Sequence, residues 1–212
     1  MLFSDRMEAA SKLAARLSDY RGKNALVLAI PRGAVPMGRR IADELEAELD
    51  VVLVRKIGAP GNPEFAIGAV DESGSMFVTE DAVATGASES YLAQEKESQL
   101  EVMRQRRSQY TPLKAPIDPA RRIVIVVDDG LATGSTMIAA LRALRQKNPE
   151  KLICAVPVAP PDTLEKVERY ADQVVCLHAT PEFFAVSQFY LHFPQVDDEE
   201  VMSILHQTGG PK

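Results

Sequence analysis

The stretch RIVIVVDDGLATGSTMIAALRAL, from Arg122 to Leu144, predicts a strand, a loop and a helix in direct succession. Its apolar run ends at Asp128 and Asp129, and a loop of small residues then leads into a run rich in Ala and Leu. A continuous apolar strand is typical of a parallel sheet that is covered on both faces. Ligands bind at the carboxyl ends of the strands in such sheets, so we expect both carboxylates at a binding edge.

The rest of the chain repeats this alternation of apolar runs and helical spacing. Further strands are predicted over 24–30, 50–54, 152–158 and 173–177, and helices over 4–17, 35–49, 89–110, 135–146, 161–170 and 196–207. The segment RKIGAPGNPE is predicted to be loop because it is rich in Gly and Pro, and FAIGAV with SMFVT is predicted to form a hairpin. We therefore expect an α/β fold with a mostly parallel central sheet flanked by helices.

The first helix is predicted to be amphipathic, and its apolar face should direct it onto the sheet. The residues expected on that face are Met7, Ala10, Leu13, Ala14 and Leu17.

Composition excludes several classes of protein. The chain has 212 residues, 46% hydrophobic and 25% charged, with a formal net charge of −6, which argues against a broad nucleic-acid or anionic-membrane surface. No apolar run approaches the length of a membrane span, and the charged N-terminal stretch does not resemble a signal peptide, so we expect a cytoplasmic protein. Cys154 and Cys176 lie in strand-like runs without paired spacing, which favours buried hydrophobes over a disulfide or a metal pair.

The loop after Asp129 has the composition of an anion site. Gly130 and Gly134 allow the backbone to approach a ligand, and the following helix contributes free N–H groups and its positive dipole end. Thr133, Ser135 and Thr136 add hydroxyl donors. Two carboxylates beside a phosphate make sense if the same ligand also offers hydroxyl groups or carries a divalent cation. A sugar phosphate offers both a phosphate for the loop and hydroxyl groups for the carboxylates.

Other phosphate motifs do not fit this loop. A P-loop requires G-x-x-x-x-G-K-[ST], whereas this loop has one residue fewer between its glycines and no lysine, and G-x-G-x-x-G is absent from the chain. A simple helix cap by Asp129 or Ser135 would explain one acidic residue. It would not explain both acidic residues, the two glycines and the three hydroxyl residues together.

The segment VIVVDDGLATGST resembles the signature of type I phosphoribosyltransferases. The resemblance implies one domain over residues 1–212, with 181–212 as a C-terminal hood, and a catalytic role for Asp128 and Asp129. These two would hold the ribose hydroxyls of phosphoribosyl diphosphate and share a Mg²⁺ ion with it. The residues implied to bind the 5-phosphate are Gly130, Ala132, Thr133, Gly134, Ser135 and Thr136.

Two further segments resemble the same family. LAIPRGAVPMGRRIADEL resembles its diphosphate loop, with Arg32 and Gly33 in the contacting positions and Ala34 where a second glycine is common. RKIGAPGNPEFAIGAV resembles a subfamily of predicted phosphoribosyltransferases, which implies diphosphate contact for Arg55 and Lys56; ordinary strand-end charges remain the alternative. Arg104, Arg106 and Arg107 form a solvated helix face or a cover over the diphosphate; these alternatives stay open.

The acceptor is expected to lie near an aromatic-rich segment, ATPEFFAVSQFYLHF, which holds five of the twelve aromatic residues. Dense aromatics usually pack a core edge, but the family places its base-binding hood here, and we expect Phe184 to stack on the base. Ala132 stands where hypoxanthine–guanine-type members usually carry an acidic residue, and LATG resembles adenine-type members instead.

The resemblance thus implies an enzyme that transfers ribose 5-phosphate to a nucleobase-like nitrogen, releases diphosphate, and acts in nucleotide salvage as a magnesium-dependent homodimer. Neither a nucleic acid nor a membrane is an expected partner. One alternative is a regulatory protein on the same fold that senses phosphoribosyl diphosphate without catalysis. The other is a hydrolase with the acidic pair as metal ligands, although adjacent carboxylates point to opposite faces of a strand.

Overall fold

The computed structural model describes residues 2–112 and 115–206. Five parallel strands form its main sheet in the order β2-β1-β6-β7-β8. Their bounds are Leu26–Ala29 (β1), Glu48–Val51 (β2), Ile123–Val127 (β6), Lys151–Ala159 (β7) and Gln173–Ala179 (β8). The predicted α/β class with a parallel central sheet is confirmed.

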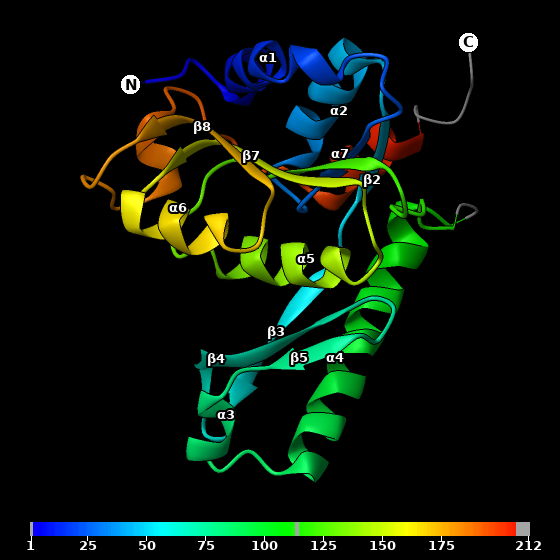
Figure 1. The fold of residues 1–212 in the computed structure, drawn as a ribbon, viewed down its shortest axis with the longest axis vertical. Coiled ribbons are helices and arrows are strands. Elements are labelled where there is room, and N and C mark those ends of the chain that lie inside the picture. The colour runs from blue at the N-terminus through cyan, green and yellow to red at the C-terminus, as the bar shows by residue number, and fades with distance from the viewer. Residues whose placement is uncertain (1, 113–114, 207–212) are drawn as a thin grey trace.

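Helices cover both faces of this sheet. Helices α1 (Arg6–Arg16) and α2 (Val35–Leu45) lie on one face, and α5 (Ser135–Arg145) and α6 (Pro161–Glu168) lie on the other (Figure 1). Alternate strand residues supply the two hydrophobic clusters, because successive side chains point to opposite faces. Val27, Ile125 and Ile153 pack with α1 and α2, whereas Leu26, Val124 and Leu152 pack with α5.

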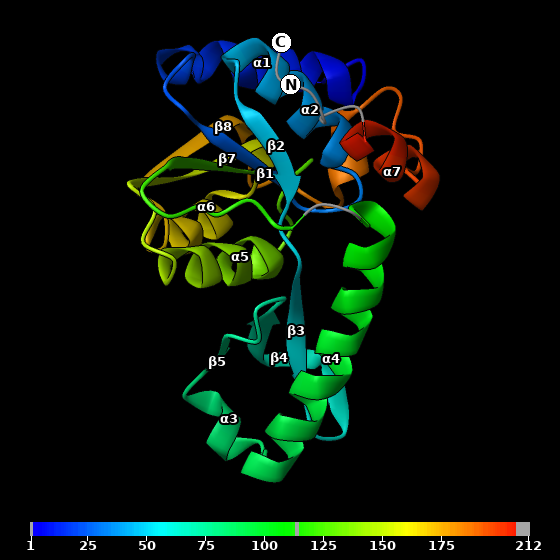
Figure 2. The same ribbon diagram turned by 90° about the vertical axis from the view of Figure 1, so that its right-hand side faces the viewer.

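Residues 54–110 project from this layered core, and we call them the arm (Figures 1 and 2). The arm contains an antiparallel sheet in the order β3-β4-β5 and the long helix α4, which runs back toward the core. Its elements are β3 (Val54–Ala59), β4 (Asn62–Asp71), β5 (Met76–Val78), α3 (Asp81–Ala84) and α4 (Glu89–Tyr110). Chain direction changes little where β2 leads into β3, so the arm is a continuation of the core's edge strand.

The predicted hairpin of β4 and β5 is confirmed, but the prediction of a loop over RKIGAPGNPE is wrong. Residues on both sides of the Pro60–Gly61 turn pair as β3 and β4. Gly58 serves close backbone approach, since an ideal Cβ there would lie 2.6 Å from the Cα of Pro63. Glycine and proline therefore mark a tight turn and a crowded strand pair.

The junction of α2 and β2 and one helix face differ most from the expectations, while most other element ends shift by one or two residues. Helix α2 ends at Leu45 because Glu46 adopts a left-handed conformation, and strand β2 then begins at Glu48. Met7 was expected on the buried face of α1 but is 43% exposed, whereas Arg6 is buried. Cys154 is buried and Cys176 half-buried, and both are free.

The segment that follows β8 packs against the beginning of the chain. Phe3 forms a parallel bridge with Tyr190, close to a short 3-10 helix at Val186–Phe189 that follows β8. A second 3-10 helix, Ser18–Tyr20, follows α1, and α7 (Asp198–His206) packs against α2 and α4. The hood over 181–212 remains a prediction, and its last residues, 207–212, lie outside the described part.

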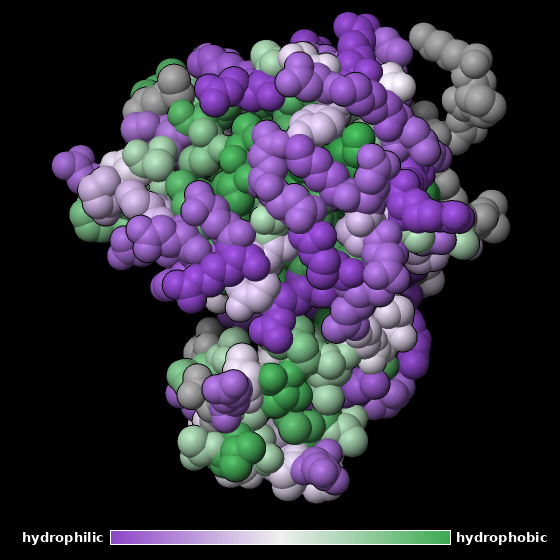
Figure 3. All heavy atoms as spheres, viewed as in Figure 1, coloured by the Kyte–Doolittle hydropathy of each residue, from purple (hydrophilic) through white to green (hydrophobic). Residues whose placement is uncertain are grey.

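The surface of the arm differs from that of the core. Figure 3 shows hydrophobic residues gathered on the arm, while hydrophilic residues dominate the visible core surface. Phe65 and Val83 are among the exposed apolar side chains of the arm. No helix among the described residues is both long and apolar enough to cross a membrane.

Candidate active site

The acidic pair follows β6 directly, at the carboxyl edge of the sheet. The Asp128 carboxylate accepts a hydrogen bond from the Asp129 backbone N–H at 2.9 Å, and within the described residues this N–H is its one hydrogen-bond donor. Burial raises the pKa of Asp128 well above its ordinary value, and the negative charge of Asp129 raises it further. The Asp128 carboxylate therefore has hydrogen-bond acceptor capacity left over for a ligand.

Asp129 is engaged differently, because it forms an ion pair with Arg6 of α1. The Nε and Nη2 atoms of Arg6 lie 3.0 and 2.9 Å from the same oxygen, Oδ2. Burial raises the pKa of Asp129, while the Arg6 charge opposes the increase. The backbone carbonyl of Asp129 accepts a hydrogen bond from the Tyr190 hydroxyl at 2.7 Å. The two adjacent acids thus have unequal freedom to bind a ligand.

Packing sets the shape of the loop between β6 and α5. Gly130 lies against Val158 and Val186, where an ideal Cβ would approach their side chains to 3.0 and 2.7 Å. Gly134 has a φ of +71° and an ideal Cβ there would lie 2.8 Å from Thr163. The Thr163 hydroxyl also donates to the Ala132 carbonyl at 2.8 Å. Glycine is required at both positions by close neighbours.

Small hydroxyl residues surround the start of α5. The N-cap is Gly134, which makes no side-chain capping bond, so capping by Asp129 or Ser135 does not explain the motif. The hydroxyls of Thr133 and Ser135 lie 3.1 Å apart, and Thr133 is exposed. This arrangement, at a helix N-terminus, suits an anion.

The loop after β1 meets the acidic pair because β1 and β6 are neighbours. An ideal Cβ at Gly33 would lie only 2.1 Å from Asp129 Oδ2, so the backbone presses against this carboxylate. The peptide bond between Pro31 and Arg32 is cis. Arg32 lies 3.4 Å from the Asp198 carboxylate of α7. A cavity of about 340 Å³ is lined by Arg6, Arg32, Gly33, Asp129, Phe193 and Gln195, among others.

Arg55 and Lys56 lie on β3 in the arm, beyond the end of the main sheet. They line a second cavity of about 600 Å³ between arm and core. Thr136 reaches this cavity from the first turn of α5, and Arg106 and Glu95 reach it from α4. Three cationic side chains therefore face one carboxylate in a space beside the α5 N-terminus.

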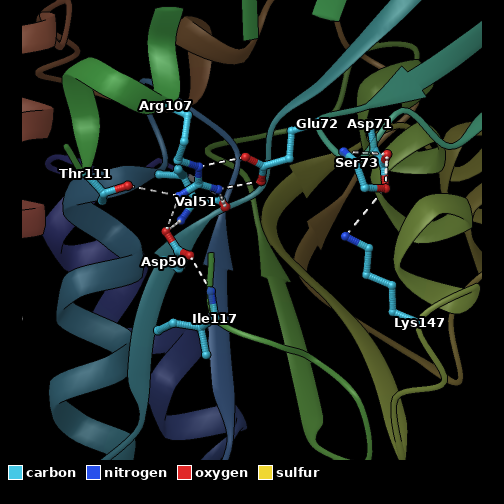
Figure 4. Close-up of polar contacts among 9 residues, drawn as sticks. All are labelled: Asp50, Val51, Asp71, Glu72, Ser73, Arg107, Thr111, Ile117 and Lys147. Carbon is cyan, nitrogen blue, oxygen red and sulfur yellow. Dashed lines mark hydrogen bonds and ion pairs between the residues drawn. The ribbon is translucent and has the colours of Figure 1, made fainter. Parts of the chain in front are cut away.

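The structure separates the three arginines of α4. Arg104 is exposed and pairs with Glu97 at 2.8 Å. Arg107 is mostly buried and binds Asp50 and Glu72 at the junction of arm and core (Figure 4). Arg106 alone of the three lines the larger cavity. The solvated-face interpretation holds for Arg104, and Arg106 is the one of the three that lies beside the α5 N-terminus.

The aromatic segment after β8 is partly structural. Phe189 and Tyr190 are buried, and Tyr190 stacks on Phe193 with ring centroids 4.7 Å apart. Phe184 is 93% exposed and lines neither of the cavities described above. Val186, two residues later, contacts Gly130, so the segment adjoins the acidic loop. Base stacking by Phe184 stays a prediction.

Sequence reasoning missed Arg6 and did not separate Arg106 from its neighbours. A signal for Arg6 was available, because it lies three, four and seven residues before Ala9, Ala10 and Leu13, all on the buried face of α1. A charged residue in an apolar helical stripe indicates a buried partner. For Arg106 the sequence carries no such signal.

A sequence profile described as the phosphoribosyl transferase domain matches residues 4–193. A protein of Mycobacterium tuberculosis named "Putative phosphoribosyl transferase" is 40% identical over 208 residues, which are 98% of this chain and 47% of that protein. The chain thus spans about half the length of the curated relatives that match nearly all of it.

One solved structure matches nearly the whole chain, and one further relative matches only a short part of it. The crystal structure of TT1426 from Thermus thermophilus has a TM-score of 0.91 and 42% identity, and the match covers 99% of this chain and 100% of that one. A uracil phosphoribosyltransferase of Clostridioides difficile is 39% identical over 61 residues, which are 29% of each protein.

Proposed function

The chain belongs to the phosphoribosyl transferase family, and on this premise we propose that it transfers ribose 5-phosphate from phosphoribosyl diphosphate to a nitrogen of a nucleobase-like acceptor. The observation that carries the proposal is the acidic pair at the end of β6, next to a glycine- and hydroxyl-rich loop at the start of α5. Carboxylates and a helix N-terminus together match a ligand with both hydroxyl and phosphate groups.

Each part of the site has a role in this proposal. Asp128 accepts hydrogen bonds from the ribose hydroxyls, and the loop 130–136 binds the 5-phosphate through N–H groups and hydroxyls. Arg32, Arg55 and Lys56 face the diphosphate as it leaves. Positive charge develops on the sugar as the bond between ribose and diphosphate breaks. Fixed charges and dipoles of the site stabilise the separated charges. Water would capture the sugar at this stage, so the reaction requires that the bound substrates displace water from the space between arm and core.

Magnesium fits the proposed site through Asp128. Mg²⁺ is usually held by one or two carboxylates together with substrate phosphates and water, so a cage of several protein ligands is not required. Within the described residues no group of three or more His, Cys, Asp or Glu side chains is placed to hold a metal. Asp129 has one oxygen bonded to Arg6, so it would offer Oδ1. The ion would neutralise charge on the diphosphate.

The acceptor is the least specified part of the proposal. We keep Phe184 as the stacking residue, because a large exposed ring in a segment that adjoins Gly130 can cover a flat base. The LATG sequence leads us to expect adenine-type rather than 6-oxopurine chemistry. A magnesium requirement, a homodimer, a role in salvage and a cytoplasmic location remain predictions.

Diphosphate release tests the proposal. The purified chain is mixed with phosphoribosyl diphosphate and Mg²⁺, nucleobases are added one at a time, and diphosphate is measured. We expect release with one base, lost when Asp128→Asn and Asp129→Asn are combined and kept when exposed Asp43 of α2 is changed to Asn. If the unaltered chain neither releases diphosphate nor binds phosphoribosyl diphosphate, the proposed function is wrong.

A further inference from the structure

Arg6 is the first residue of α1, yet its side chain is only 10% exposed. A basic residue in the first turn of a helix is unfavourable with respect to the helix dipole, and a buried guanidinium also loses hydration. Its contacts therefore have to compensate for both costs. They do so with three nitrogen atoms, two on Asp129 and the third, Nη1, on the Pro194 carbonyl at 2.6 Å.

The plane of the Arg6 guanidinium is fixed by an aromatic ring. Its central carbon lies 3.6 Å from the centroid of the Phe193 ring. Phe193 stacks in turn on Tyr190, whose hydroxyl donates to the Asp129 carbonyl. Asp129 is consequently held at its side chain by Arg6 and at its backbone by Tyr190. A planar fork of donors over a ring is a geometry that lysine does not reproduce.

The loop after β1 packs against this ion pair, and we call it and the loop after β6 the two ligand loops. An ideal Cβ at Gly33 would lie 2.1 Å from Asp129 Oδ2 and 3.2 Å from Arg6 Nη2. The backbone of the Arg32–Gly33 loop thus packs directly on the paired carboxylate and guanidinium. Arg6 joins four segments that are distant in sequence: α1, the loop after β1, the loop after β6, and residues 190–194.

We propose that Arg6 is a positioning residue: by holding Asp129 against Gly33, it fixes the loop after β1 and the loop after β6 relative to each other. The inference deepens the proposed function and rests on it for the identity of the ligand. The arrangement of the loops themselves can be tested without any ligand. Under this proposal Arg6 touches no reacting atom and acts through Asp129 and the Gly33 backbone.

Arg6→Met is the informative variant, because methionine keeps an apolar contact with Phe193 but removes every donor. The matched control is Arg16→Met, which removes the same charge from an exposed position in the last turn of α1. In the free protein we expect hydrogen exchange of peptides that cover 30–36 and 128–136 to accelerate about tenfold or more in Arg6→Met and not in Arg16→Met. Unchanged exchange in both loops would overturn the proposal.

A double-mutant cycle shows whether Arg6 acts through Asp129. In the Asp129→Asn background the carboxylate charge is gone, so adding Arg6→Met should change loop exchange much less than it does in the unaltered chain. Equal acceleration in both backgrounds would mean that Arg6 supports the fold in general, and the proposal would then be wrong. Arg6→Lys should fall between the unaltered chain and Arg6→Met.

Kinetics with phosphoribosyl diphosphate and Mg²⁺ separate positioning from stability. A partly unfolded variant has fewer active molecules, so its apparent kcat falls while its KM stays the same. Loss of loop positioning instead raises the KM for phosphoribosyl diphosphate, by about tenfold for each 1.4 kcal/mol of lost binding free energy. A fall in kcat with unchanged KM would overturn the proposal. Failure of the unaltered chain to bind the ligand would count against the proposed function alone, because the exchange experiment still decides the role of Arg6.

Discussion

Asp128 is a carboxylate whose protein contacts do not replace the water it loses on folding. It is half-buried, next to a second acid, and accepts one backbone N–H. Both burial and the Asp129 charge raise its pKa, so the ionised form costs stability in the folded protein. Residues kept at such a cost are common at functional sites, where a ligand supplies the missing contacts.

Asp128→Asn is therefore expected to stabilise the protein at neutral pH. The pKa is raised above 3.8, so the folded state binds this proton more tightly than the unfolded chain does. As the pH rises above 3.8, the unfolded carboxyl ionises first and the unaltered protein loses stability until the raised pKa is passed. The free energy of unfolding in urea should favour the variant at pH 7 more than at pH 3. A variant that is less stable at pH 7 would contradict this reasoning.

Gly33→Ala should disrupt the contact between the two ligand loops. The added Cβ would lie 2.1 Å from Asp129 Oδ2, so either the loop or the ion pair has to shift. We expect a loss of about 1–3 kcal/mol in the free energy of unfolding, typical of overpacking, and weaker binding of phosphoribosyl diphosphate. Calorimetry and urea unfolding measure both effects. Unchanged affinity would show that the position of this loop does not matter for the ligand.

At the scale of elements, one buried network joins α4 to the end of β2 and the end of β4. Arg107 Nη1 lies 2.7 Å from the Asp50 carboxylate, and its other nitrogens bind Glu72 (Figure 4). Asp50 also accepts the Ile117 N–H at 3.0 Å, which holds the return of the chain into the core. The side chains of Arg107 and Asp50 are only 13% and 5% exposed, so neither can find water easily if its partner is lost.

Arg107→Met is expected to cost about 3–5 kcal/mol of the free energy of unfolding, because it leaves Asp50 buried without its cation. The control lies on the same helix: Arg104→Met removes an exposed pair and should cost less than about 1 kcal/mol. Denaturant unfolding of the two variants gives the comparison. Equal losses would mean that the junction does not depend on this network.

At the scale of the whole molecule, the arm and the core enclose the larger cavity together. Neither part alone supplies its lining, because Arg55, Lys56 and Arg106 come from the arm and Thr136 comes from the core. The Tyr110 hydroxyl at the end of α4 also donates to Asp198 of α7 at 2.6 Å. Burial, with help from Asp198, raises the pKa of Tyr110 to about 12, so the hydroxyl keeps the proton that it donates well above neutral pH.

Arg106→Gln tests whether the arm contributes to ligand binding. The change removes a cation from the cavity, and we expect the affinity for phosphoribosyl diphosphate to fall by about tenfold, which corresponds to 1.4 kcal/mol. Arg104→Gln, which also removes one arginine charge from α4 but lies outside the cavity, should leave the affinity unchanged. Equal affinities of the two variants would assign Arg106 to the solvated surface.

Local patterns predicted the core and, in the arm, the β4–β5 hairpin and helix α4, but they missed β3 and the start of β4. The apolar runs of β1, β6 and β7 and the helices between them were predictable, since a strand buried on both faces needs continuous apolar sequence. The arm strands β3 and β4 contain the Gly and Pro residues that usually mark loops. Their pairing became visible only when the backbone contact of Gly58 and Pro63 was known.

The sequence alone determined that Asp128 and Asp129 end a parallel strand and that a glycine-rich loop leads from them into a helix. These features depend on neighbours in the chain, so local spacing was sufficient. Only the tertiary structure decided that the two acids differ, because Arg6 reaches Asp129 across 123 positions. It also decided which arginine of α4 reaches a cavity and which joins the arm to the core. Burial and charge pairing depend on which segments meet in space, and the spacing along the chain does not contain that information.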